Sequence, residues 1–130
     1  MSQNDISFAT HNICGLSLTK KSHLATFSRD VKYVTLRSVL NKTDFVAFTE
    51  TKVAGSTEDL KNFSPLGKNF KLVTYSCSGP GDGLLCLAKK SLEIVRSDII
   101  YPGRIVRSIC KKSNLCLAFF PFIYQPMTKP

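Results

Sequence analysis

The first half of the chain alternates between hydrophobic and polar residues in a pattern that predicts a strand, a helix and a second strand. Residues 6–13 (ISFATHNI) alternate in polarity, which is typical of a strand. Residues 31–41 (VKYVTLRSVLN) place most of their apolar side chains on one helical face, and Asp30 is the expected N-cap. Residues 44–51 (DFVAFTET) are apolar and rich in β-formers, which predicts a strand with polar residues at its end.

The second half reads as β-structure almost throughout. Residues 55–68 predict a loop with at most one helical turn. After them come five candidate strands separated by the turn sequences SGPGDG, YPG and KKSN, at residues 70–76, 84–91, 92–99, 104–110 and 115–124. A strand–helix–strand start followed by hairpin-linked strands predicts an α/β fold: one mixed β-sheet of about five or six strands with a helix on one face.

Composition narrows the class of protein. A chain of 130 residues, 43% hydrophobic and 21% charged, fits a single domain over residues 1–130. No apolar run approaches the roughly 20 residues that a membrane-spanning helix needs. Residues 1–10 (MSQNDISFAT) lack the basic start and apolar centre of a secretory signal. We therefore expect an intracellular protein, cytoplasmic or nuclear, that is neither secreted nor inserted in a membrane.

The cysteines agree with a reducing compartment. There are five, and no two have the C-x-x-C spacing of a zinc ribbon or a redox motif. Cys86 lies in GLLCLA and Cys116 in NLCLAFF, where a thiol acts as a small apolar filler. Reduced cysteines in the core are therefore expected rather than a disulfide framework.

The net charge indicates an anionic partner. Eighteen Lys and Arg against nine Asp and Glu give +9, and such a surface attracts phosphate backbones. Lysine pairs fall at loops and strand ends, and each pair alone is ordinary solvated surface. Together with Lys52, Arg104 and Arg107 they favour a nucleic-acid partner.

Two short segments carry candidate chemistry. THNICG (10–15) ends the first strand and TETK (49–52) ends the second. Parallel neighbours in a strand–helix–strand unit deliver their C-terminal ends to one edge of the sheet, so Asn12 and Glu50 should lie close together. An amide beside a carboxylate suits Mg²⁺, which prefers oxygen ligands, although a solvated strand-end glutamate explains Glu50 on pattern alone. GPGDG reads as a hairpin turn, and His11 as a packed histidine.

Five motifs, taken in order, resemble the endonuclease/exonuclease/phosphatase superfamily, and within it the apurinic-type endonucleases of LINE-like retrotransposons. They are ISFATHNICGL (6–16), FVAFTETK (45–52), GDGLLCLAKKSL (81–92), GRIVRSI (103–109) and FIYQP (122–126). The resemblance implies that Glu50 binds Mg²⁺, that Asn12 positions Glu50 or the phosphate, and that Tyr124 hydrogen-bonds the scissile phosphate. It also implies that Arg104 belongs to the strand leading into the site.

The chain departs from this family in ways that bear on activity. Cys14 stands where the family usually has Asp or Asn. Thr49 replaces the usual Gln, and Met127 replaces the usual Asn. The family's second half, with an Asp-x-Asn motif and a terminal Asp-His pair, has no counterpart, since no histidine follows His23 and no acidic residue follows Asp98. The resemblance thus implies about one half of a four-layer α/β sandwich, with an apolar sheet face uncovered near LCLAFFPFIY (115–124).

Three functions remain open at this point. The first is a truncated or degenerate Mg²⁺-dependent endonuclease domain, a retroelement remnant with little or no activity alone. The second is a basic nucleic-acid-binding module without catalysis. The third is a chain that completes its fold by associating, through the uncovered sheet face, with itself or a partner.

Overall fold

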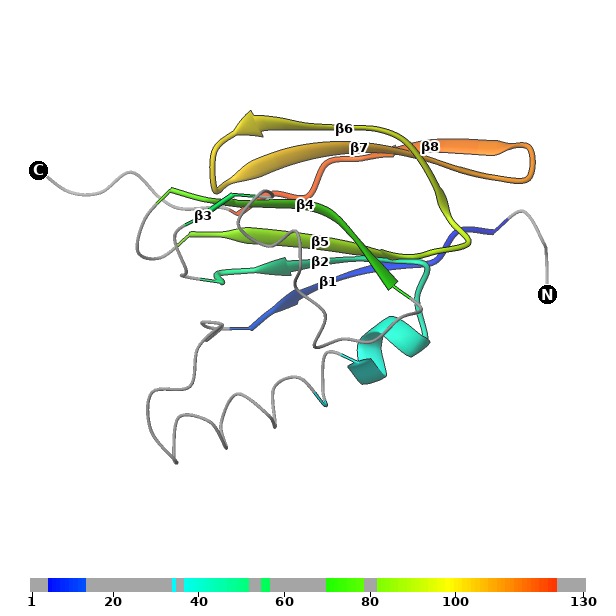
Figure 1. The fold of residues 1–130 in the computed structure, drawn as a ribbon, viewed down its shortest axis with the longest axis horizontal. Helices are drawn as coiled ribbons and strands as arrows, with labels where there is room; N and C mark the ends of the chain where they lie inside the picture. The colour runs from blue at the N-terminus through cyan, green and yellow to red at the C-terminus, as the bar shows by residue number, and fades with distance from the viewer. Residues whose placement is uncertain are drawn as a thin grey trace, which may run out of the picture.

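The computed structural model describes residues 5–13, 34, 37–51, 55–56, 70–78 and 82–123. Within them it places eight strands in two sheets, one with the order β1-β2-β5-β4-β3 and one with the order β6-β7-β8. Figure 1 shows the second sheet lying over one face of the first, with helical residues on the opposite face. Within the described residues, no helix has the length and apolar character needed to cross a bilayer.

The strand–helix–strand start is confirmed. β1 (Phe8–Asn12) pairs in parallel with β2 (Phe45–Thr49), from Phe8 opposite Phe45 to Asn12 opposite Thr49. Of the predicted helix 31–41, residues 34 and 37–41 are helical, and the remaining positions lie outside the described residues, as does the expected cap Asp30. A parallel pair requires such a crossover connection, and this one returns the chain beside its first strand.

The rest of the first sheet is antiparallel. β5 (Leu84–Lys89) lies against β2, and β4 (Phe70–Cys77) lies against β5, which confirms the strands predicted in these segments. The short edge strand β3 (Gly55–Ser56) pairs with β4 in a segment where the sequence predicts a loop. The single helical turn predicted in that loop lies outside the described residues.

The first sheet confirms a mixed sheet of five strands, but the prediction that the later strands belong to the same sheet is wrong. β6 (Glu93–Tyr101), β7 (Ile105–Lys112) and β8 (Leu115–Phe119) form an antiparallel sheet of their own. The central strands β2 and β5 are buried along nearly their whole length, so both faces of the first sheet need an apolar cover. The second sheet supplies that cover on one face.

Two hydrophobic clusters result, one on each face of the first sheet. The cluster between the sheets joins residues of β2 and β5 to inward side chains of the second sheet: Phe45, Ala47, Leu84, Cys86, Ala88, Leu92, Val106, Cys110 and Phe119. The cluster on the helix side is formed by Ile13, Leu40, Val46, Phe48, Tyr75, Cys77, Leu85 and Leu87. Alternate residues of β2 thus enter opposite clusters, as the period of two in a strand requires.

Among the described residues, most of the exposed large apolar side chains lie on the second sheet and the residues after it, although Phe8 of β1 is also exposed. The edge strand β8 and the residues after it expose Leu117, Phe120 and Phe122, as expected for this segment, whereas Phe119 is buried. Cys86 is buried as predicted. The prediction that Cys116 is an apolar filler is wrong, because its side chain is exposed on this edge strand.

Candidate functional site

The candidate site begins where the two parallel strands end. Asn12 closes β1 and Glu50 follows β2, and the Asn12 side-chain amide donates a hydrogen bond to Glu50 Oε2. The predicted proximity of these two side chains is confirmed. An amide N–H that donates to a carboxylate fixes the direction of that carboxylate, so Asn12 orients Glu50 at the rim of the sheet.

The backbone around Glu50 is held in an unusual conformation. Glu50 has a φ of 57°, in the left-handed region that side-chain-bearing residues seldom adopt. On one side, the N–H of Ile13 donates to the carbonyl of Thr49 at 3.1 Å, and on the other the N–H of Thr51 donates to the carbonyl of Gly83 at 3.4 Å. These neighbouring anchors maintain the strained residue between them, a combination often found at functional positions.

A buried pair of hydroxyls lies beneath this bend. Thr51 and Tyr75 are both fully buried, and the Thr51 hydroxyl donates to the Tyr75 hydroxyl at 3.3 Å. Burial raises the pKa of Tyr75 to about 12, so the phenol stays neutral and serves to position Thr51. The sequence analysis placed neither residue at this site, although a threonine directly after the strand-end glutamate was visible in TETK.

Asp82, which the sequence analysis also missed, lies beside the contacts that hold the β6–β7 turn at the same end of the molecule. Its buried carboxylate accepts a hydrogen bond from the N–H of Ser78 at 3.0 Å. The N–H of Gly103 donates to the Ser76 hydroxyl at 2.7 Å, and the carbonyl of Gly103 accepts from the N–H of Gly83 at 3.0 Å. Asp82 belongs to the GPGDG segment, which the sequence predicts only as a hairpin turn.

The two predicted arginines occupy different places. Arg104 follows Gly103 in the turn at the Glu50 end, with its guanidinium 5.8 Å from the centre of the Tyr101 ring. Arg107 lies on β7 and donates to the Asp98 carboxylate at 2.6 Å, which holds the pKa of Asp98 below its ordinary value. The structure therefore brings Arg104 to the site end and pairs Arg107 with a carboxylate.

The remaining predicted residues, Tyr124 and Lys52, lie outside the described residues, as does Cys14. The roles assigned to Asn12, Glu50 and Arg104 stay predictions. His11 is exposed, and its ring lies edge-on to Phe48 with 6.2 Å between the ring centres.

The side chains at this rim offer oxygen atoms, the type of ligand that a hard cation prefers. Glu50 offers a carboxylate and Asn12 an amide, and Mg²⁺ is commonly held by one or two carboxylates together with waters and substrate phosphates. Among the residues that the structure describes, no group of three or more His, Cys, Asp and Glu side chains could hold a metal ion.

Comparison with known proteins identifies a fold but no family by sequence. No protein-family model matches the chain, and no curated protein matches it. A solved structure, AP endonuclease LMAP from Leishmania major, matches with a TM-score of 0.61 at 15% sequence identity. The match covers 91% of this chain and 40% of that protein. The chain thus has the fold of part of an AP endonuclease and spans well under half of its length.

Proposed function

We propose that residues 1–130 form a domain of the endonuclease/exonuclease/phosphatase type, related to Mg²⁺-dependent phosphodiesterases, with DNA as its partner. The observation that carries the proposal is the contact between Asn12 and Glu50 at the ends of two parallel strands. It occurs in a fold that is similar to part of an AP endonuclease. The order of the sequence motifs further favours the branch carried by LINE-like retrotransposons.

Each residue has a distinct role in this proposal. Glu50 holds the metal, Asn12 keeps the Glu50 carboxylate pointing outward, and Arg104 attracts the phosphate backbone from the neighbouring turn. The chemistry that Mg²⁺ supplies when bound is polarisation of a phosphoryl oxygen. Tyr124 and Lys52 are proposed to contact the phosphate from segments that follow β8 and β2.

We further propose that these 130 residues alone hydrolyse DNA little or not at all. Cleavage of a phosphodiester needs a group that activates water and a group that assists the leaving oxygen. In the sequence, no histidine follows His23 and no acidic residue follows Asp98. The matched endonuclease has further chain beyond the 40% that the match covers.

The test measures binding and cleavage separately on duplex DNA containing an abasic site. We expect binding that strengthens with Mg²⁺ and weakens when Glu50 is replaced by Gln, with little strand cleavage. Glu93→Gln, which removes an exposed carboxylate from β6, is the matched control and should leave the Mg²⁺ effect intact. Robust cleavage abolished by Glu50→Gln would contradict the proposed inactivity, and Mg²⁺-independent binding would contradict the proposed metal role.

A second candidate, a basic nucleic-acid-binding module without a metal, is favoured by the net charge of +9. It predicts binding to intact DNA and to abasic DNA with equal affinity, whether or not Mg²⁺ is present. Its affinity should fall steeply with salt, because contacts to phosphates release counterions. The same Glu50→Gln variant separates the two candidates, since this module would bind as well without the carboxylate.

A further inference from the structure

A pocket of about 470 Å³ lies at the end of the first sheet opposite to Glu50. Phe45, the first residue of β2, is paired with Ala88 near the end of β5, whereas Thr49 is paired with Leu84. Lys89 therefore lies at one end of the sheet and Glu50 at the other. The pocket is lined by Asn41, Phe70, Lys89, Lys90 and Ser91.

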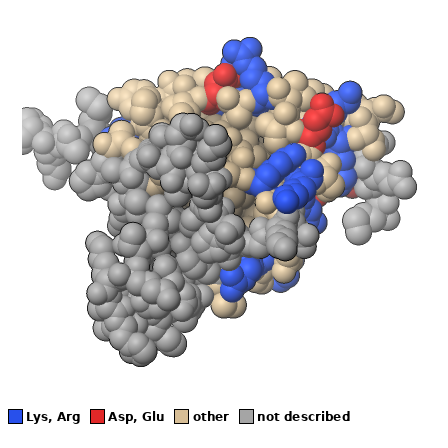
Figure 2. All heavy atoms as spheres, in the orientation of Figure 1, with Lys and Arg blue, Asp and Glu red and all other residues tan. Residues whose placement is uncertain are grey.

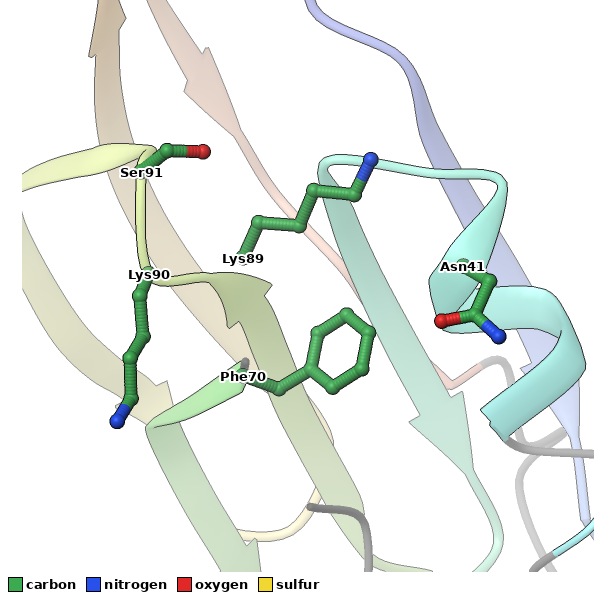
Figure 3. Close-up of a pocket in the computed structure, with 5 residues that line it drawn as sticks. All are labelled: Asn41, Phe70, Lys89, Lys90 and Ser91. Atoms are coloured by element: carbon green, nitrogen blue, oxygen red, sulfur yellow. The ribbon is translucent and has the colours of Figure 1, made fainter. Parts of the chain in front are cut away.

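The lining combines lysine ammonium groups, which suit an anion, with the flat aromatic ring of Phe70. Figure 3 shows Lys89 and Phe70 extending from neighbouring strands toward Asn41, with Lys90 and Ser91 on the other side. Phe70 is opposite Lys89 in the β4–β5 register and also packs against the core, so its ring has a fixed orientation. None of the five lining residues is acidic.

The surroundings add positive charge and hold the turn in place. The ammonium of Lys71 donates to the carbonyls of Lys90 and Leu92, which fixes the turn that carries Ser91. The nearby Asp44 carboxylate lies 3.2 Å from the Lys112 ammonium and 4.0 Å from that of Lys89. Of the two lysines that face Asp44, Lys89 is therefore the one with the longer ion pair.

The charge is visible at the molecular surface. In Figure 2, several Lys and Arg side chains, with an acidic one among them, lie on the right-hand side of the molecule, which in Figure 1 is the end where β5 turns into β6. Lys89 and Lys90 occupy that turn, and Lys71 reaches it from β4. A phosphate approaching the pocket would therefore meet several ammonium groups.

We propose that this pocket binds a nucleotide, with the phosphate at Lys89 and the base stacked on the Phe70 ring. The volume lies within the range of about 300–1,000 Å³ that is usual for small-molecule sites. Stacking on an aromatic ring is tolerant of base identity, and lysines bind phosphate as point charges. The nucleotide is either free or a unit of a single strand, and this site is separate from the proposed metal site at Glu50.

The experiment titrates the full chain with four probes while amide NMR signals of residues near the pocket are followed. The probes are adenosine 5′-monophosphate, adenosine, inorganic phosphate and a short oligothymidylate. We expect the monophosphate to shift the signals of Phe70, Lys90 and Ser91, and adenosine and inorganic phosphate to bind more weakly. Tighter binding of the oligothymidylate identifies a single strand as the source, and tighter binding of the monophosphate identifies a free nucleotide.

Two variants and a control locate the binding. Phe70→Leu keeps an apolar side chain and should weaken binding roughly tenfold through lost stacking. Lys89→Gln keeps the side-chain length and should weaken it roughly fivefold, more at low salt. Arg96→Gln removes one positive charge from the exposed part of β6 and should leave the affinity unchanged.

Thermal unfolding of each variant checks that it is folded. If Phe70→Leu is not, Lys89→Gln and Arg96→Gln decide the outcome. The proposal is overturned if neither the monophosphate nor the oligonucleotide binds, if inorganic phosphate binds as tightly as they do, or if Arg96→Gln weakens binding as much as Lys89→Gln. Loss of nucleotide binding with Mg²⁺-dependent DNA binding intact overturns this inference alone, because the two sites share no residue.

Discussion

Glu50 is a candidate functional residue whose backbone conformation is energetically unfavourable. Its φ of 57° is unfavourable for any residue with a Cβ, by about 1–2 kcal/mol. Glycine adopts this conformation freely but loses more entropy on folding, which offsets part of the gain. The carboxylate is therefore presented from a position where glycine would be more stable, which is the pattern expected when function outweighs stability.

This predicts that Glu50→Gly is more stable to urea than Glu50→Ala by about 1 kcal/mol, although both lose the carboxylate. Ser113 provides a matched control, because it has a φ of 54° in the turn between β7 and β8. Ser113→Gly should gain a similar amount over Ser113→Ala and leave Mg²⁺-dependent DNA binding unchanged. Equal stability of Glu50→Gly and Glu50→Ala would show that the bend is not strained.

Gly103 is constrained by both space and conformation. It has a φ of +74°, and a Cβ at this position would lie 2.7 Å from the carboxyl group of Asp82. Gly103→Ala should therefore lower the free energy of unfolding by roughly 2–4 kcal/mol, as measured by urea denaturation. In an Asp82→Ala background the loss should be smaller, because the steric part disappears while the backbone part remains. An unchanged loss would exclude the clash as its cause.

For individual residues, the local sequence pattern predicts contacts between the ends of neighbouring strands but misses contacts that depend on distant parts of the chain. The meeting of Asn12 and Glu50 follows from two strand ends in a parallel unit, and both strands have local signals. The role of Asp82 depends on the approach of Gly103, which lies 21 positions later in the chain. A turn motif contains no information about such a distant partner.

Asp44, just before β2, connects several elements by electrostatics. Its carboxylate accepts a hydrogen bond from the N–H of Ser7 at 3.0 Å and lies 3.2 Å from the ammonium of Lys112 at the end of β7. Burial raises the pKa of Asp44, but the Ser7 hydrogen bond, Lys112 and Lys89 together hold it below the ordinary value of 3.8. The ionised carboxylate thus links the start of the first sheet to the second sheet.

This link predicts a specific dependence of stability on pH. Because the folded-state pKa of Asp44 is lowered, its stabilisation is present above pH 3.8 and is lost as the pH falls through the folded-state value. Asp44→Asn should cost about 1–2 kcal/mol at neutral pH, and the difference from the natural chain should shrink in acid. Lys112→Met should remove part of the same effect. A constant difference from pH 7 to acid, followed by chemical denaturation, would contradict this assignment.

Strands were predictable as elements, but their distribution between sheets was not. Alternation and turn residues mark β4 to β8 whichever sheet they join, because a hairpin has the same local signal in either case. The deciding feature is the unbroken burial of β2 and β5, which demands cover on both faces. The continuous apolar runs FVAF and LLCLA already contained that information. β3, with two residues, is too short to produce a periodic pattern.

For the whole molecule, the cluster between the sheets decides whether the two layers behave as one cooperative unit. Phe119 of β8 is 7% exposed, and its ring centre lies 5.3 Å from that of Phe45 in the first sheet. The Phe8 ring of β1 lies 4.4 Å from Phe119. The three rings connect β8, an edge strand of the second sheet, to β1 and β2 of the first sheet. The backbone hydrogen bonds of each sheet cannot make this connection, because they join only strands of the same sheet.

Phe119→Ala should therefore lower the free energy of unfolding by about 3–4 kcal/mol, through the lost contacts and the cavity left behind. Phe122→Ala is the matched control, because Phe122 is 63% exposed and its truncation should change stability by no more than about 0.5 kcal/mol. Far-ultraviolet circular dichroism and tyrosine fluorescence should report one coincident transition in the natural chain and in Phe122→Ala. If Phe119→Ala instead separates the transitions, so that one sheet unfolds before the other, each layer is stable alone. The observed packing would then not be what makes the two sheets a single domain.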